Sequence, residues 1–137
     1  MSVDWHHGLL RDLPEEECRR LLDTGSLGRL VYVDDEGPVA VPVNYVSQQG
    51  TVLLRISPHG SVGRHIRGRV VGFEVDEIDT ATRSGWSVLV RGTARFVDVE
   101  DLPLGNDARP QPWPEGVRSL HVRVTPRSVT GRQLLAE

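Results

Sequence analysis

The chain has 137 residues, of which 38% are hydrophobic and 26% charged, and these proportions are typical of one soluble globular domain spanning residues 1–137. The net charge of −3 argues against the broad basic surface of a nucleic-acid-binding protein. One cysteine excludes an intrachain disulfide, and no apolar run approaches the roughly 20 residues that span a bilayer. With no signal-like N-terminus, these features predict a cytoplasmic protein without a membrane partner.

The first predicted element is a helix over residues 13–24, which follows an N-terminal arm at residues 1–12. Pro14 suits the first helical position, and three glutamates occupy the first turn, where they complement the helix dipole. Gly25 can end the helix. The pattern therefore predicts one helix before the strands begin.

Three strands are expected next, in "GRLVYVDDEGPVAVPVNYV" and "TVLLRIS", with turns at residues 35–37 and 48–50. Short turns between consecutive strands predict an antiparallel meander. Pro42 lies inside the second strand, although proline cannot donate to a sheet ladder. The sequence thus marks a point at which ordinary strand pairing is interrupted and the backbone is open to another partner.

The second half of the chain adds further strands and one short helix. Gly92 predicts a bend or bulge in a long strand. About six strands with so little helix favour a closed or split barrel. In chain order we expect a short helix at 61–67, strands at 69–77 and 86–99 around a loop at 78–85, a proline-rich loop at 102–116, and a final strand at 120–131.

The common enzyme signatures are absent: the sequence has no CxxC, GxSxG, HExxH, Walker or GxGxxG motif. Only His59 and His65 have a spacing useful for a metal, and no third ligand accompanies them, so polar surface histidines are favoured and no metal is expected. Glu74 and Asp76 share one face of a predicted strand, opposite Phe73. The favoured interpretation is a solvated face, because nothing in the sequence indicates burial of these carboxyl groups.

Residues 55–69 combine arginines, serines and three glycines at a strand-to-helix junction. All sixteen basic residues of the chain are arginine, whose planar guanidinium suits phosphate and carboxylate. The segment therefore predicts either a phosphate-binding cradle or an exposed helix with solvated arginines. Trp86 and Trp113 stand beside loops, where an indole covers a planar ligand or packs in a core or a dimer contact.

The order of several blocks resembles the pyridoxamine 5'-phosphate oxidase-like family of FMN-binding split-barrel proteins. The blocks are "LPEEECRRLLDTGSLGRLVYVDDEGPVAVPVNYV", "GTVLLRISPHGS", "VVGFEVDEIDTATRSGWSVLVRGTARFV" and a "PW" loop before "VRVTPRSVTGR". The resemblance covers residues 13–132 and is strongest to short actinobacterial-type and nitroimidazole-reductase-like members.

The resemblance implies a mainly β (α+β) fold: a six-stranded antiparallel Greek-key split barrel that pairs as a homodimer and binds FMN at the subunit interface. It also implies a flavin-dependent oxidoreductase that acts on a small molecule by hydride transfer, with no catalytic side chain identified. In such proteins the backbone of the second meander strand faces the flavin instead of a neighbouring strand. The implied cofactor contacts are Val43, Asn44 and Tyr45 at the ring, Arg55, Ile56, Ser57, Ser61 and Arg64 at the phosphate, and Trp86 and Ser87 at the pocket wall.

The chain departs from this family at one important position. Members commonly follow the glycine-serine pair with a basic residue that contacts phosphate, whereas this chain has Val62, so Arg64 would have to substitute. The chain also lacks the further basic residues of a true pyridoxamine phosphate oxidase, and only Arg123 stands where one is expected. Three alternatives to FMN stay open: deazaflavin F420, haem, or a cofactor-free dimeric binding or regulatory module.

Overall fold

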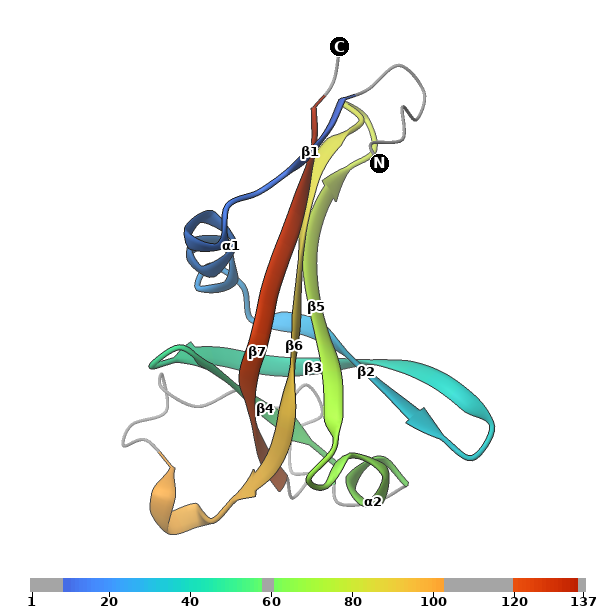
Figure 1. The fold of residues 1–137 in the computed structure, drawn as a ribbon, viewed down its shortest axis with the longest axis vertical. Helices are drawn as coiled ribbons and strands as arrows, with labels where there is room; N and C mark the ends of the chain where they lie inside the picture. The colour runs from blue at the N-terminus through green and yellow to red at the C-terminus, as the bar shows by residue number, and fades with distance from the viewer. Residues whose placement is uncertain (1–8, 58–60, 103–119, 136–137) are drawn as a thin grey trace.

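Figure 1 shows the fold as a computed structural model, which describes residues 9–57, 61–102 and 120–135. These residues form antiparallel strands, two α-helices and one 3-10 turn. Neither helix of this described part is long and apolar enough to cross a membrane. The elements in chain order are β1 (Leu9–Asp12), α1 (Glu15–Leu22), β2 (Leu27–Asp34), β3 (Gly37–Gln48), β4 (Thr51–Ile56), α2 (Val62–Ile66), β5 (Val70–Asp79), β6 (Ser84–Val97), η1 (Val99–Asp101) and β7 (Leu120–Leu135).

Strands β2 to β7 close into a ring. The order around the ring is β7-β4-β3-β2-β5-β6, and β6 pairs again with β7. Because β5 lies beside β2 while β3 and β4 follow on the other side, strands β2 to β5 form a Greek key. The expected six-stranded Greek-key barrel is confirmed. In Figure 1, β5, β6 and β7 run along the length of the molecule, and β2 and β3 cross them.

A further strand, β1, lies outside the ring and pairs with the last four residues of β7, from Leu9 opposite Leu135 to Asp12 opposite Arg132. The sequence predicted an N-terminal arm over residues 1–12 and no strand within it, and the structure adds the strand at Leu9–Asp12. Four residues are too few to show a strand periodicity in the sequence. They form a strand because β7 continues past its predicted end at residue 131 and offers them a partner.

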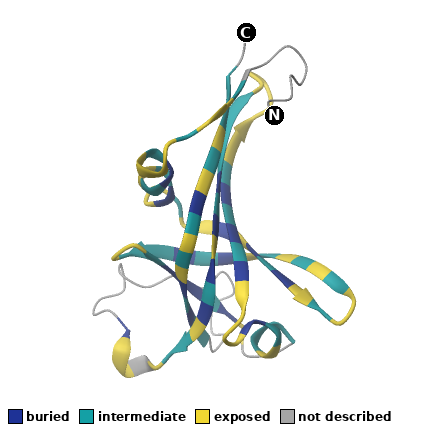
Figure 2. Ribbon diagram, viewed as in Figure 1, coloured by how far each residue is buried: buried dark blue, intermediate teal, exposed yellow. Residues whose placement is uncertain are grey.

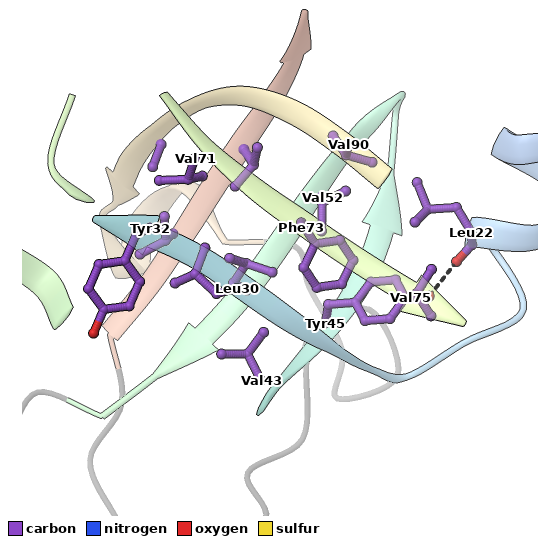
Figure 3. Close-up of a cluster of buried hydrophobic side chains, with 14 of the residues drawn as sticks. Leu22, Leu30, Tyr32, Val43, Tyr45, Val52, Val71, Phe73, Val75 and Val90 are labelled. Carbon is purple, nitrogen blue, oxygen red and sulfur yellow. Dashed lines mark hydrogen bonds between the residues drawn. The ribbon is translucent and has the colours of Figure 1, made fainter. Parts of the chain in front are cut away.

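The core lies inside the ring and is built by alternation along the strands. Leu30 and Tyr32 are buried in β2 while their neighbours are not, and Phe73 and Val75 repeat the pattern in β5. Figure 2 shows these buried positions along the crossing strands. The rings of Tyr45 and Phe73 meet edge to face at 4.7 Å between centroids in the middle of this core, as Figure 3 shows.

Helix α1 lies against β7 and β6 and contributes Cys18 and Leu22 to the core cluster. It was predicted over residues 13–24 and occupies Glu15–Leu22, with Pro14 at the N-cap and the three glutamates in the first turn. Cys18 is fully buried and faces Gly131, where a Cβ would lie 2.6 Å from the Cys18 sulfur. The glycine therefore lets the helix approach β7 closely.

Strand β3 pairs with β2 from Gly37 to Asn44, and its pairing with β4 begins only at Asn44. The Tyr45 amide donates to the Ser26 carbonyl, and the antiparallel alternation then directs the main chain of Pro38, Ala40 and Pro42 away from β2. We call this stretch the open edge of β3. Pro42 is tolerated because its missing N–H would point to the side on which β4 does not pair.

Several local predictions can be checked against the remaining connections. The register of β6 with β7 shifts between Arg91 and Gly92, which confirms the predicted bulge. The predicted loop 78–85 is shorter than expected, because β5 extends to Asp79 and β6 begins at Ser84. The proline-rich loop predicted at 102–116, with Trp113, lies outside the described residues except for Leu102.

Candidate functional site

The predicted phosphate cradle lies where β4 leads into α2. Helix α2 covers Val62–Ile66 instead of the predicted 61–67, and its Ile66 side chain is fully buried while Arg64 is exposed. His65 Nδ1 donates to the Ser61 carbonyl over 2.7 Å. The His65 ring also stacks on Tyr32, with centroids 6.5 Å apart, which fixes the helix against β2. Arg64 thus projects from an anchored turn.

Two other predicted residues come together on the outer surface of the ring. Asn44 pairs with Arg55 across β3 and β4, and Arg55 pairs with His121 across β4 and β7. The neighbours of these residues, such as Tyr45 and Leu54, point into the core, so the three polar side chains share the outer face. His121 was not proposed from the sequence. Its place on the polar side of "LHVRV" was the only available signal.

Three predicted contact residues, Val43, Tyr45 and Ile56, have side chains in the core, with exposed fractions of 6%, 1% and 5%. Any contact they make with a ligand would have to come from the main chain. The main chain of Asn44 pairs with β4 and that of Tyr45 with β2. The expectation that this backbone faces a ligand instead of a strand is therefore wrong for Asn44 and Tyr45. The open edge of β3 lies just before them.

Trp86 and Ser87 lie elsewhere, on β6, and both are half-buried. As neighbours in a strand they face opposite sides: Ser87 shares the outer face of Leu89 and Arg91, and Trp86 packs against the core cluster. They line a pocket of about 200 Å³ together with Ile78, Arg132 and Leu134. Ser87 and Arg132 also line a second pocket of about 620 Å³, so the two pockets adjoin. The combined hollow has the size and mixed lining of a small-molecule site.

The cradle and the Trp86 pocket do not meet within one chain. Strand β7 pairs with Arg55 at His121 and with Trp86 at Gln133, twelve residues further along. At about 3.3 Å per residue, this stretch of strand spans roughly 40 Å. That separation is longer than a flavin mononucleotide, so residues from both ends could contact one such molecule only if two chains contributed.

A charged cluster lies beside the larger pocket. One guanidinium nitrogen of Arg29, from β2, lies 2.8 Å from a Glu74 oxygen and 3.1 Å from an Asp76 oxygen. The Glu74 and Asp76 side chains are only 26% and 25% exposed. Burial, and then the neighbouring Asp76, raise the pKa of Glu74 to about 7, although Arg29 opposes this shift.

The predicted solvated face is confirmed only in part: Glu74 and Asp76 share the outer face opposite Phe73, but their side chains are only about a quarter exposed and are paired with Arg29. The sequence concealed this cluster because Arg29 comes from another strand, 45 residues before Glu74. Among the described residues, no three histidine, cysteine or acidic side chains gather as a metal site. Arg123, whose role the sequence left open, donates to the Thr51 hydroxyl over 2.8 Å and so holds the turn between β3 and β4.

Comparison with known proteins identifies the family of this chain. Residues 14–133 match the family described as pyridoxamine 5'-phosphate oxidase. The chain belongs to this family. The resemblance read from the sequence blocks is thereby confirmed.

Several relatives of this pyridoxamine 5'-phosphate oxidase family member come from Mycobacterium and Corynebacterium. An uncharacterized protein of Mycobacterium tuberculosis, Rv0080, is 30% identical over 131 residues, which cover 92% of this chain and 86% of the relative. An FAD binding protein from Mycobacterium smegmatis is 32% identical, with a TM-score of 0.69 over 90% of this chain and 97% of its own. A putative pyridoxamine 5'-phosphate oxidase from Corynebacterium glutamicum is 29% identical, with a TM-score of 0.74 over 93% and 95% of the two chains.

Proposed function

We propose that this protein is a flavin-dependent oxidoreductase that binds FMN between the two chains of a homodimer and acts on a small molecule. The observation that carries the proposal is the placement of the predicted contact residues in two groups at opposite ends of β7. A twofold axis that brings the cradle of one chain to the Trp86 pocket of the other would complete two equal sites. The similarity to an FAD binding protein supports a flavin as the occupant.

The residues present fit a flavin in their chemistry. Arg55, Ser57, Ser61 and Arg64 supply two guanidinium groups and two hydroxyls, which suit a phosphate. Asn44 and the open edge of β3 supply an amide side chain and outward main-chain carbonyls for the polar edge of the ring system. Trp86 would cover an apolar part of the ring from the partner chain.

A bound flavin supplies hydride transfer, and the chain supplies position, polarity and access. Other family members have a basic residue at the position of Val62. Arg64 takes over this role here, since it is exposed in the first turn of α2. No group in the cradle is assigned to proton transfer. The physiological substrate follows from the shape of the assembled pocket and not from the fold.

The first experiment is a visible absorbance spectrum of the purified protein, with thermal shifts in FMN, FAD, F420 and haem. A ligand that binds only the folded state raises the melting temperature of the protein, and a tighter ligand raises it further at the same concentration. A flavin spectrum, or a shift with FMN, is the expected result. If only F420 or haem shifts the melting temperature, that molecule is the cofactor instead of FMN. If none of the four shifts it, a cofactor-free dimeric module is favoured.

A complementation experiment tests the shared site directly. Arg64→Ala and Trp86→Leu each damage a different half of the site, so each homodimer loses both flavin sites. Refolding the two variants together gives heterodimers with one intact site, and roughly one quarter of all sites should recover flavin for random pairing. If the refolded mixture forms dimers but binds no flavin, the site is not shared between chains.

A further inference from the structure

The larger pocket, of about 620 Å³, lies on the outer face of β5, β6 and β7. Its lining combines two arginines, two hydroxyls and two carboxyl groups, those of Asp12 and Glu74, around the apolar side chain of Leu89. The ladder fixes this arrangement, because Leu89 of β6 pairs with Glu74 of β5 on one side and with Thr130 of β7 on the other. We call it the β5–β7 pocket. Besides Asp12, its polar lining side chains are Glu74, Ser87, Arg91, Thr130 and Arg132.

The two arginines of this pocket lack a compensating charge. Arg91 and Arg132 are exposed, and within the described ranges neither side chain forms an ion pair or hydrogen bond. Asp12 is opposite Arg132 in the β1–β7 ladder, but their charged groups are not within ion-pair distance. The two guanidinium groups therefore leave a positive end in the pocket.

Glu74 and Asp76 are, in contrast, already compensated, whereas Asp12, which also lines the pocket, forms no ion pair within the described ranges. Arg29 contacts both Glu74 and Asp76 from the β2 side. The pKa of Glu74 is about 7, chiefly because of burial, so near neutral pH this residue carries a proton about half of the time. A protonated Glu74 is a hydrogen-bond donor, as are the hydroxyls of Ser87 and Thr130.

We propose that the β5–β7 pocket binds the oxyanion group, a carboxylate or a phosphate, of a small molecule between Arg91 and Arg132. A guanidinium group binds either oxyanion through parallel N–H bonds, and two of them supply both charge and direction. Ser87 and Thr130 complete the donor set from the same face. The pocket volume leaves room for an apolar body over Leu89 beside the charged end.

Binding at this pocket is linked to the proton on Glu74. Ionised Glu74 repels an oxyanion, whereas protonated Glu74 donates to it, so the anion binds more weakly as pH rises through about 7. The charged groups that face Glu74 are Arg29 from β2, Asp76 on its own strand, and Arg91, Arg132 and Asp12 around the pocket. Glu74 is the group on which the expected pH dependence rests.

This pocket also bears on the reaction. Ser87 lines both this pocket and the one walled by Trp86. If the proposed flavin site is correct, on which this point rests, an anion held by Arg91 and Arg132 would lie beside the flavin. The substrate would then be an anionic small molecule with an apolar body.

Titration calorimetry with sulfate tests the site, because sulfate stays a dianion from pH 6 to pH 8, so that its own charge does not change. Acetate is the second probe and represents a carboxylate, and chloride at equal ionic strength corrects for screening. The variants are Arg91→Gln, Arg132→Gln and Glu74→Gln. The control is Arg95→Gln, which removes another exposed arginine of β6 that does not line the pocket.

For wild-type protein and the control, we expect saturable binding that is about tenfold weaker at pH 8 than at pH 6. Arg91→Gln and Arg132→Gln should each weaken binding at least tenfold. Arg91→Gln, which does not alter the lining of the Trp86 pocket, should leave flavin absorbance per chain unchanged. Glu74→Gln should bind equally at both pH values, as tightly as wild type at pH 6. Equal binding by wild type and both arginine variants would overturn the site, and loss of flavin together with sulfate would make it part of the flavin site.

Discussion

The Tyr45 hydroxyl donates a buried hydrogen bond of 2.7 Å to the Leu22 carbonyl and so ties strand β3 to the end of helix α1 (Figure 3). Burial raises the pKa of Tyr45 to about 12, so the hydroxyl keeps its proton at every ordinary pH. A Cβ at Gly25 would collide with this hydroxyl, which explains the glycine after the helix. Tyr45 is thus a structural residue at a position where the family resemblance predicts a cofactor contact.

Tyr45→Phe should lower the free energy of unfolding by about 1–3 kcal/mol, because it leaves the Leu22 carbonyl buried without its donor. Chemical denaturation measures this loss. The affinity for flavin should stay within twofold of wild type, because the ring points into the core. A large loss of flavin in a variant that is still folded would return Tyr45 to the site.

Arg64→Ala should weaken FMN binding at least tenfold, because it removes one charge-assisted partner of the phosphate. Flavin fluorescence during dilution of the loaded protein measures the dissociation constant. Arg67→Ala is the matched control, since Arg67 follows the same helix but its guanidinium lies over the Phe96 ring at 4.0 Å. If Arg64→Ala and Arg67→Ala bind FMN with equal affinity, Arg64 does not contact the phosphate.

Glu74 should make stability fall between about pH 4.5 and pH 7. Its pKa is raised from 4.5 to about 7 in the folded protein, so the folded state binds more protons than the unfolded state in this interval. After allowance for partial exposure, the loss should be about 1–2 kcal/mol. The stabilisation is complete below pH 4.5 and is lost above pH 7.

Glu74→Gln tests this pH dependence, because glutamine does not titrate. The free energy of unfolding of the variant, measured by urea denaturation at several pH values, should lack the fall seen in wild type. A variant that keeps the same slope would show that another group titrates.

Gly92→Ala should destabilise the protein by about 3 kcal/mol or more, because a Cβ there would collide with the Thr125 carbonyl oxygen at the β6–β7 bulge. Gly72→Ala is the control within another strand, where the new Cβ would meet its nearest atom, Val31 Cβ, at 3.4 Å. Thermal unfolding of both variants compares the two positions. A similar melting temperature for both would mean that the bulge can relax.

The element pattern of the chain was readable from local signals. Pro14 and the glutamates of the first turn indicated α1, and the alternation around Phe73 indicated β5. Gly92 indicated a bulge, and the structure has one at that residue. These features depend on neighbours in sequence, such as backbone conformation, capping and the two-residue period of a strand.

The candidate site was only partly readable. The blocks of residues that resemble the family nominated Asn44 and Arg55, which lie on the outer surface of the ring, and Trp86, which packs against the core from β6 and lines the smaller pocket. The same blocks nominated Tyr45, whose side chain is in the core. A sequence block marks a position along a strand, but only the closed ring decides which face of that strand is covered.

By itself, the sequence determined the helix, the strands, the bulge and the family of this protein, because each is encoded in residues close together along the chain. Only the tertiary structure decided that β1 extends the sheet, that Arg29 compensates Glu74, and that the cradle and the Trp86 pocket lie at opposite ends of β7. These relationships join residues tens of positions apart. They exist because strand register decides which side chains become neighbours. Burial beside those neighbours then shifts the pKa of a group such as Glu74.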